Sequence, residues 1–268
     1  MNQRVLDSIR FYDSNLNVIP YGQWGIHEYP DGQNQLWFSR DAVRRLRRAE
    51  VSVWCPELLD LALQVELIDQ HSSINEKVIM YAYGSRCDKV WQGDTLAAPV
   101  ANLIDDEIFP GWVVLLPHHD SCWGSEIEPP IDLSSYKGII GADASALLRW
   151  GYEGVSATKE RDATTGEVTR LALPTLEPGH YLVMDDICDG GATFLRLADE
   201  LDAQGVTADL LVMHGVFSNN GDSKVADRYQ NVYVSNSYPL GRPVDPRVKV
   251  FNVWGLDDLD GAIPPLTQ

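Results

Sequence analysis

The segment from His180 to Leu197, HYLVMDDICDGGATFLRL, constrains the fold more than any other stretch of the chain. Its short apolar run, Tyr181 to Met184, predicts a buried strand of a parallel sheet. Two adjacent acids end the run, and a loop over Ile187 to Ala192 follows them. From Thr193 onward, apolar residues recur at helical spacing. The segment therefore predicts a strand, a glycine-containing loop and a helix, the repeating unit of an α/β protein.

The same segment predicts an anion-binding site. Backbone N–H groups converge on a phosphate at a helix N-terminus, and Gly190 and Gly191 let the phosphate approach the backbone. The hydroxyl of Thr193 is a further donor. Because carboxylates repel a phosphate, Asp185 and Asp186 imply a divalent cation or sugar hydroxyls between them and the phosphate. An ordinary strand-to-helix connection that binds nothing is the alternative for these residues.

The net charge and the cysteines limit which binding partners and which cellular compartment are expected. The 268 residues include 21 lysines and arginines against 39 aspartates and glutamates, a net charge of −18. Such a surface repels nucleic acid and anionic membranes, so neither is expected as a partner. Four widely spaced cysteines without a CxxC pattern favour free thiols. With no signal-peptide core and no apolar run of membrane-spanning length, we expect a cytoplasmic protein.

Strands that end in polar loops recur along the chain. Apolar runs predict strands at 51–55, 77–83, 112–116, 138–141, 181–184, 209–214 and 231–235, and periodicity predicts helices at 39–50, 56–70 and from 144 to 150. The ionisable residues at or near the predicted strand ends are Arg86, Asp88, His118, His119, Asp120, Asp143, Lys159, Arg161, Asp185, Asp186 and Asp189. Ligands of parallel α/β sheets bind beyond the carboxyl ends of the strands, so this set predicts one site.

Eight motifs, in order, resemble those of the phosphoribosyl pyrophosphate synthetase (ribose-phosphate diphosphokinase) family, which has the type I phosphoribosyltransferase fold. They are Tyr29-Pro-Asp31-Gly-Gln33, Arg86-Cys-Asp88, Pro117-His118, Ala142-Asp143-Ala144, Lys159-Glu-Arg161, the D-D-x-x-D-x-x-x-T of Asp185 to Thr193, His214 to Ser218, and Ser235 to Leu240. The resemblance covers nearly the whole chain. It implies two tandem phosphoribosyltransferase-like domains with mainly parallel sheets flanked by helices, over residues 1–140 and 141–268.

The resemblance also implies an activity and a set of roles. The expected reaction is the Mg²⁺-dependent transfer of the β,γ-diphosphate of ATP to the anomeric 1-hydroxyl of a ribose phosphate, with release of AMP. The implied ATP-binding residues are Tyr29, Asp31, Gln33, Arg86 and Asp88. The implied ribose-phosphate-binding residues are Asp185, Asp186, Asp189, Gly190, Gly191, Ala192 and Thr193. Catalysis would fall to Lys159, Arg161 and His118, and His118, Asp143 and Asp120 would bind the metal. The family commonly assembles into dimers and hexamers, which predicts a homo-oligomer.

The phosphate loop departs from the family pattern. Asp189-Gly-Gly-Ala-Thr193 stands where the usual sequence is close to Asp-Thr-Ala-Gly-Thr. Loss of the first threonine removes a hydroxyl donor to a terminal 5-phosphate and opens space beside it, which suits the diphosphate of ADP-ribose. The predicted acceptor is therefore ribose 5-phosphate or ADP-ribose, and the product phosphoribosyl pyrophosphate or ADP-ribose pyrophosphate. The second reaction fits the synthetase-like branch that is associated with phage-encoded NAD⁺ salvage.

Two other functions stay open, and so do structural roles for single residues. A non-catalytic regulatory relative would share the fold, although such relatives commonly lose the Lys-x-Arg pair or the ribose acids, both of which this chain keeps. A phosphoribosyltransferase that consumes phosphoribosyl pyrophosphate would need one such domain, and the motifs before residue 140 would be unexplained. As an alternative to catalytic roles, His118 could have a purely structural role. Lys159 and Arg161 could likewise be solvent-exposed residues of a loop that bind no substrate.

Overall fold

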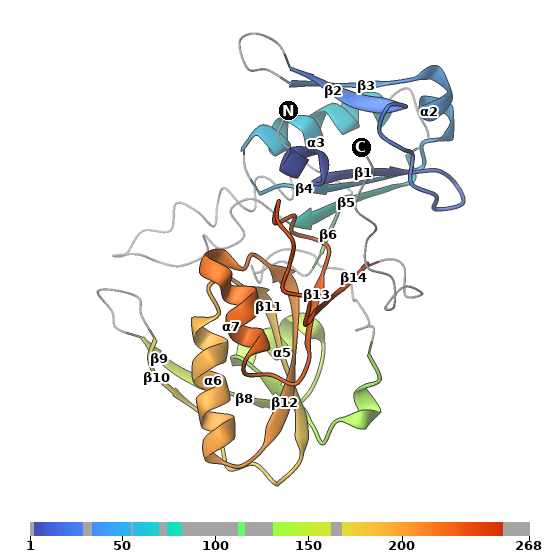
Figure 1. Cartoon of the computed structure of the whole chain (residues 1–268). Helices are drawn as coiled ribbons and strands as arrows, with labels where there is room; N and C mark the ends of the chain where they lie inside the picture. The colour runs from blue at the N-terminus through green and yellow to red at the C-terminus, as the bar shows by residue number, and fades with distance from the viewer. Residues whose placement is uncertain are drawn as a thin grey trace, which may run out of the picture. The chain divides into compact units, whose positions relative to one another are not determined.

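The computed structural model of the chain describes residues 3–28, 34–54, 56–69, 74–81, 112–115, 131–161 and 168–253. The chain divides into two compact units, Met1–Ser125 and Glu126–Gln268 (Figure 1). Each unit has its own hydrophobic core. Among the described residues, no helix has both the length and the apolar character that crossing a membrane requires.

The first unit is built on a mixed four-stranded sheet. Its elements are α1 (Gln3–Leu6), β1 (Ile9–Tyr12), β2 (Trp24–Glu28), β3 (Asn34–Phe38), α2 (Arg40–Arg45), β4 (Arg48–Ser52), α3 (Pro56–Asp69), β5 (Glu76–Tyr81) and β6 (Val113–Val114). The sheet has the order β1-β4-β5-β6, and β1 is the antiparallel member. Strands β2 and β3 form a separate antiparallel pair.

Helix α3 packs on this sheet and accounts for much of the core. Its residues Leu58, Leu61 and Val65 recur at helical spacing and are buried with Ala49 and Val51 of β4. The predicted helix over 39–50 is wrong in its second half, because α2 ends at Arg45 and β4 begins at Arg48. All five residues of β4 are buried between β1 and β5, so strand pairing overrides the helical propensity of the arginine-rich sequence.

The second unit contains a six-stranded sheet. Its elements are η2 (Leu133–Ser135), β7 (Ile139–Gly141), α5 (Ala144–Trp150), β8 (Val155–Ser156), β9 (Thr158–Arg161), β10 (Val168–Ala172), β11 (His180–Cys188), α6 (Ala192–Ala203), β12 (Thr207–Gly215), η3 (Ser218–Asn220), α7 (Gly221–Ala226), β13 (Val232–Ser235) and β14 (Val248–Phe251). The sheet has the order β14-β13-β12-β11-β7-β8, and every pair in it is parallel. Strands β9 and β10 form an antiparallel hairpin.

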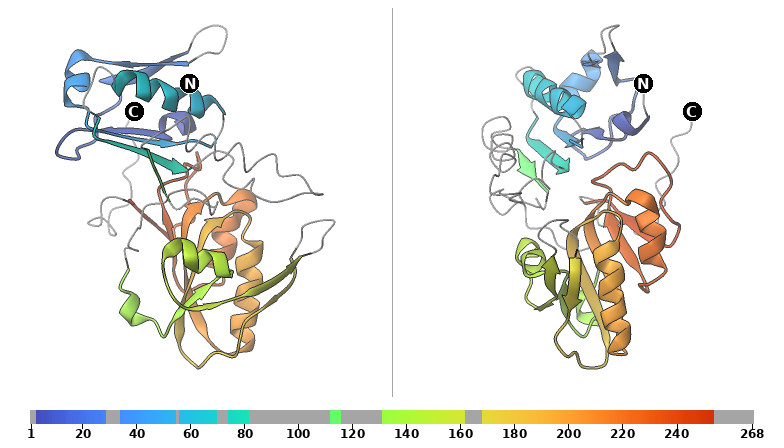
Figure 2. Two further views of the ribbon diagram at one scale, coloured as in Figure 1. Left: turned by 180° about the vertical axis from the view of Figure 1, so that it is seen from behind. Right: turned by 90° about the vertical axis from the view of Figure 1, so that its left-hand side faces the viewer.

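Helices cover both faces of the six-stranded sheet. Figure 2 shows α5 on one face and α6 with α7 on the other. The apolar positions of α6, Phe194, Leu197 and Leu201, are buried with Val183 of β11 and Leu210 of β12. A parallel sheet flanked by helices confirms the predicted α/β class.

The strand order places a topological switch point between β7 and β11. After β7 the chain moves to the edge strand β8, and after the β9–β10 hairpin it returns to β11 on the other side of β7. From β11 the strands continue to the opposite edge. Ligands of open α/β sheets bind at the carboxyl ends of strands where the order reverses in this way. The fold therefore points to the ends of β7 and β11.

Two predicted boundaries around the central motif are corrected. β11 does not end before the acids: it runs through Asp185 and Asp186 to Cys188, which pairs with Gly215 of β12. Helix α6 begins at Ala192, so the loop between strand and helix is only Asp189 to Gly191. Parallel pairing of eight of the nine residues of β11 with β12 outweighs the low strand propensity of the two aspartates.

Candidate active site

The carboxylates of Asp185, Asp186 and Asp143 gather at the switch point. Asp186 is only 1% exposed and Asp185 is buried beside it on β11, while Asp143 is the second residue after the end of β7. The Oδ1 of Asp185 accepts the N–H of Asp186, and the Oδ1 of Asp186 accepts the N–H of Ile187, both at 2.9 Å. Trp150 Nε1 also donates to the backbone carbonyl of Asp185 at 3.0 Å. These bonds hold the two acids in fixed positions.

Arg149 lies among these three carboxylates. Its Nη2 is 3.2 Å from Asp186 Oδ1, 3.5 Å from Asp185 Oδ1 and 4.0 Å from Asp143 Oδ1. The Arg149 side chain is only 10% exposed. Because little water reaches this position, the attraction between the guanidinium and the three carboxylates is only weakly screened.

Helix α5 sets the position of Arg149. Asp143 caps the helix, since its Oδ1 accepts the N–H of Ala146 at 3.0 Å. Gly151, with a φ of 72°, ends the helix in a left-handed conformation that glycine adopts readily. Arg149 is in the last turn, where a cation also faces the negative end of the helix dipole.

The glycine loop and the start of α6 form the predicted phosphate site. Gly191 is the N-cap of α6 with a φ of 83°, and no side chain among the described residues caps the helix. The first N–H groups of any helix have no acceptor within the helix, and here no described side chain takes that place. The positive end of the helix dipole lies at the same position. Thr193 is within this first turn. The arrangement is suited to an anion.

A strained turn after β12 supports the glycine loop. Phe217, Asn219 and Asn220 have φ values of 49°, 52° and 59°, which are uncommon for residues with a Cβ and most costly for a bulky one. Ser218, between them, donates from Oγ to Asp189 Oδ1 at 2.5 Å. The N–H groups of Val216 and Phe217 both donate to the carbonyl of Cys188. Strain of this kind persists only where the surroundings hold it in place.

An ion pair between the half-exposed Arg242 and the buried Asp222 holds that turn in place. Arg242 donates from both terminal nitrogens to Asp222 at 2.8 Å, and from Nη2 to the carbonyl of Phe217 at 3.1 Å. Asp222 is 1% exposed and also accepts the N–H of Asp245 at 2.9 Å. The side-chain hydrogen bonds from Arg242 lower the pKa of Asp222 below its ordinary value of 3.8. The pair therefore stays charged at neutral pH.

The imidazole of His214 and the thiol of Cys188 lie near the glycine loop, and both are buried. His214 at the end of β12 is buried, and its Nδ1 lies 2.7 Å from Ser237 Oγ. This contact ties the segment after β13 to β12. Cys188 is buried beside Asp189, and burial raises the pKa of its thiol well above the ordinary value. The thiol is therefore a poor nucleophile at neutral pH.

The structure describes only some of the residues predicted from sequence. It brings together Asp143, Asp185 and Asp186, and it places Asp189, Gly190, Gly191, Ala192 and Thr193 in one loop and helix start. Lys159 and Arg161 are in β9, paired with Leu171 and Val168 of β10, and their side chains lie outside the described part. The predicted residues Tyr29, Asp31, Gln33, Arg86, Asp88, His118 and Asp120 lie outside the described residues.

Sequence reasoning missed Arg149 and the turn after β12. A basic residue in the last turn of a short helix is common for electrostatic reasons, so Arg149 carried no distinct signal of its own. The available signal was its distance of six residues from Asp143, which places it nearly two turns further along the helix that Asp143 begins. The pair Asn219-Asn220 signalled a left-handed turn, because asparagine tolerates that conformation.

The fit of these residues to a metal is partial. Aspartate oxygens are ligands that Mg²⁺ accepts. Within the described ranges, no group of three or more His, Cys, Asp or Glu side chains is arranged to hold a metal ion. Arg149 already provides a cation among Asp143, Asp185 and Asp186.

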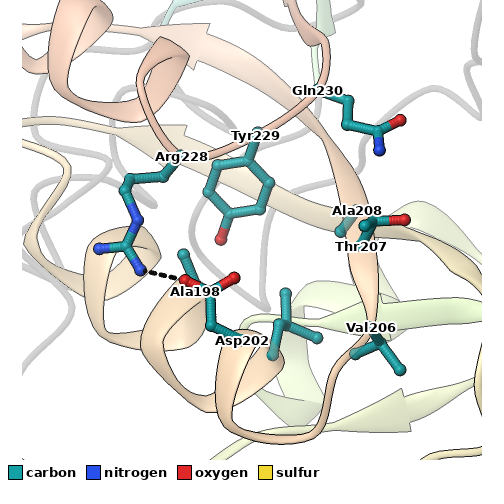
Figure 3. Close-up of a pocket in the computed structure, with 9 residues that line it drawn as sticks. Ala198, Asp202, Val206, Thr207, Ala208, Arg228, Tyr229 and Gln230 are labelled. Carbon is teal, nitrogen blue, oxygen red and sulfur yellow. Dashed lines mark hydrogen bonds and ion pairs between the residues drawn. The ribbon is translucent and has the colours of Figure 1, made fainter.

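A pocket of about 60 Å³ lies beside the end of α6 that is far from Gly191 (Figure 3). Thr207 and Tyr229 line it, together with Arg228, which donates to Asp199 at 2.7 Å and to Asp202 at 2.9 Å. Small-molecule sites usually have volumes of roughly 300 to 1,000 Å³. This pocket is too small for a nucleotide, and its cation is paired with surface acids.

The parallel six-stranded sheet with helices on both faces defines the second unit as an α/β domain. No protein-family model matches the sequence, and no curated protein matches it. Among solved structures, the chain is similar to phosphoribosylpyrophosphate synthetase from Mycobacterium smegmatis. The match has a TM-score of 0.65 and 15% sequence identity, and it covers 89% of this chain and 88% of the other. At this identity the likeness establishes the fold.

Proposed function

We propose that the chain is a ribose-phosphate diphosphokinase. One observation carries the proposal: buried Asp185 and Asp186 lie at the switch point of a synthetase-like fold, a few residues before the uncapped N-terminus of α6. Carboxylates that only accept hydrogen bonds match the hydroxyls of a ribose, and the helix N-terminus matches its 5-phosphate. The site thus offers complementary groups for both ends of a ribose phosphate.

The reaction joins the anomeric oxygen of the ribose to a phosphate of ATP. The 1-hydroxyl oxygen attacks the β-phosphorus, the bond from that phosphorus to the oxygen bridging to the α-phosphate breaks, and AMP leaves with the bond electrons. The hydroxyl proton is released. Such transfers depend mainly on positioning and on cations that stabilise the developing charge. Asp185 and Asp186 would hold the 2- and 3-hydroxyls so that the 1-hydroxyl lies in line with the β-phosphorus.

The family resemblance supports the roles of the residues that would act on ATP and on the transferred phosphates. We propose Lys159 and Arg161 for the transferring diphosphate, and Tyr29, Asp31, Gln33, Arg86 and Asp88 for ATP. His118, Asp120 and Asp143 are the proposed ligands of Mg²⁺, which when bound neutralises phosphate charge. We also propose that the chain assembles into a homo-oligomer, as the resembling family does.

The acceptor is ribose 5-phosphate or ADP-ribose, and the surroundings of Gly190 support the larger one. Among the described residues, a Cβ at Gly190 would meet Ser218 alone, at 3.7 Å from its Oγ and 3.9 Å from its carbonyl oxygen, which is ordinary contact distance. A Cβ at Gly191 would lie 3.1 Å from Val225, on a backbone with positive φ. Room for a side chain therefore exists at Gly190 and is missing at Gly191. A second phosphate group of the acceptor could extend toward Gly190.

The test of the activity is AMP release from ATP and Mg²⁺, with ribose 5-phosphate and ADP-ribose as parallel acceptors and mass spectrometry of the product. We expect AMP together with a diphosphorylated acceptor. Transfer to ribose 5-phosphate alone would identify an ordinary synthetase activity and refute the larger acceptor. No AMP with either acceptor would refute the proposed function and favour a regulatory protein.

The acceptor is tested by two substitutions at the same position. Gly190→Thr restores a hydroxyl and fills the space, and Gly190→Ala fills part of the space without a hydroxyl. We expect Gly190→Thr to shift the ratio of kcat/KM values toward ribose 5-phosphate by roughly tenfold, the contribution of one hydrogen bond to a charged group. Gly190→Ala should shift it less. An unchanged ratio in both variants would remove the argument for ADP-ribose.

A further inference from the structure

Among the described residues, Arg149 is the one cation that contacts the two acids at the switch point, and it has no role in the proposed reaction as described above. Its guanidinium lies within 3.5 Å of Asp186 and Asp185 and within 4.0 Å of Asp143. Among the described residues, its buried Nε has no hydrogen-bond partner. Stable buried arginines usually satisfy all of their donors, because an unmade hydrogen bond in the interior destabilises the fold. The position of Arg149 is therefore not optimal for stability.

The geometry of the two acids explains why a cation is needed there. Asp185 and Asp186 are adjacent, and both are withdrawn from water. A positive charge beside two such close carboxylates offsets their mutual repulsion. Carboxylates accept hydrogen bonds, which is what the hydroxyls of a vicinal diol require of the groups that bind them.

The same contacts determine where the acids point. Each Oδ1 is held by a backbone N–H and by the Nη2 of Arg149, so each carboxylate has little freedom to rotate. A carboxylate has about four lone-pair positions, so a hydroxyl can bind to one whose Oδ1 is already engaged. The guanidinium thus orients the groups that would read the sugar.

We infer that Arg149 is a positioning residue for the acceptor: its guanidinium orients Asp185 and Asp186 so that they bind the 2- and 3-hydroxyls of the ribose. This inference rests on the proposed function. It makes Arg149 the source of discrimination between a ribose and a sugar that lacks the 2-hydroxyl. Arg149 is not assigned a direct contact with the reacting atoms.

The experiment measures equilibrium binding by calorimetry without ATP. The ligands are the acceptor that the wild type binds, ribose 5-phosphate or ADP-ribose, and its analogue without the ribose 2-hydroxyl. The variants are Arg149→Met, which removes the charge at similar length, and Arg149→Lys, which keeps a charge but not the two-sided fork. Arg228→Met is the matched control, since Arg228 also joins two carboxylates on the surface of this unit, Asp199 and Asp202. Figure 3 shows Arg228 beside Asp202.

We expect the wild type and Arg228→Met to prefer the ribose over the deoxy analogue by roughly tenfold to a hundredfold, the usual range for a hydrogen bond to a charged group. Arg149→Met should bring the two affinities within about threefold, the size of a weak hydrogen bond. Arg149→Lys should fall between. A purely structural arginine would weaken both ligands equally and leave their ratio unchanged, and that result overturns the inference.

Three further outcomes separate a failure of this inference from a failure of the proposed function. If Arg149→Met does not fold, the ratio for Arg149→Lys decides, because a folded lysine variant with the wild-type ratio contradicts the positioning role. If the wild type binds neither acceptor and releases no AMP, the proposed function itself fails. If it releases AMP while all variants keep the same ratio, only the role of Arg149 fails.

Discussion

The two ends of the six-stranded sheet both bury aspartates but surround them differently. At the amino end, Asp209 of β12 is 3% exposed and accepts from Tyr136 Oη at 2.7 Å and from the N–H and Nδ2 of Asn231 at 3.0 Å. His180 Nε2 lies 3.3 Å from the same carboxylate. At the carboxyl end, Asp185 and Asp186 both contact Arg149. Among the described residues, the amino end thus places several donors on one acid, and the carboxyl end places one arginine among several acids.

This difference distinguishes a structural cluster from the candidate site. Donors such as Tyr136 and Asn231 satisfy Asp209 without adding a further charge, and burial followed by the bond to Asp209 raises the pKa of Tyr136, so it remains a donor. Crowded like charges cost stability, and proteins retain them mainly where a site needs them. The comparison predicts that changes at the carboxyl end mainly affect activity and changes at the amino end mainly affect stability.

The largest effect is expected from Asp186→Asn. The amide presents donors where the ribose hydroxyls need an acceptor, so kcat/KM should fall by about a hundredfold or more, equivalent to about 3 kcal/mol of transition-state stabilisation. Steady-state AMP release measures this change, and circular dichroism checks the fold. Activity within about threefold of the wild type would contradict a role for Asp186 in acceptor binding.

The matched change at the amino end is Asp209→Asn. The amide cannot accept all the hydrogen bonds that the carboxylate accepts, so the free energy of unfolding should fall by about 2 to 3 kcal/mol. Urea denaturation measures it. The kcat/KM of the folded variant should equal that of the wild type. A large loss of activity at unchanged stability would reverse the contrast between the two ends.

Arg242→Met tests the clamp behind the strained turn, and its effect depends on pH. Removing the guanidinium leaves Asp222 buried and should cost about 2 kcal/mol near neutral pH. Because the folded pKa of Asp222 is lowered, its contribution is present above the ordinary value of 3.8 and is lost as pH falls through the lowered folded pKa. The stability difference between wild type and variant should therefore shrink between about pH 5 and pH 2. A difference that stays constant over this range would show that the charge of Asp222 is not involved.

The smallest effect is expected from Tyr136→Phe. It removes one of the donors to Asp209 and should cost about 1 kcal/mol of unfolding free energy, with no change in AMP release. Urea denaturation of this variant beside Asp209→Asn shows how much of the network depends on one donor. A cost as large as that of Asp209→Asn would mean that Tyr136 carries the whole network.

The sequence predicted what depends on local patterns. The apolar run before Asp185, the glycine pair after Asp189 and the amphipathic spacing of α6 each follow from neighbouring residues, and the structure has a strand, a loop and a helix there. Asp143, two residues past the end of β7, was found in the same way. The parallel class followed from repeating this pattern along the chain.

What the sequence did not predict depends on tertiary contacts. Arg149 is 37 residues from Asp186, and only the pairing of β7 with β11 brings them together. The segment before β14 contains Gly241 and Pro243, which are typical of a loop. β14 is a strand because it pairs with β13. The extension of β11 through its acids likewise depends on β12, because local propensity disfavours aspartate in strands.

The contact between Gly221 and the glycine loop limits how this site can change. A Cβ at Gly221 would lie 2.4 Å from the carbonyl oxygen of Asp189, so the backbones of two loops from different strands touch without a side chain between them. Neither loop can lengthen, shift or gain bulk there unless the other moves with it. Across homologous proteins, residues 189–191 and 217–221 should therefore vary together. A graft that exchanges acceptor specificity with another protein should succeed only when both segments are transferred as one.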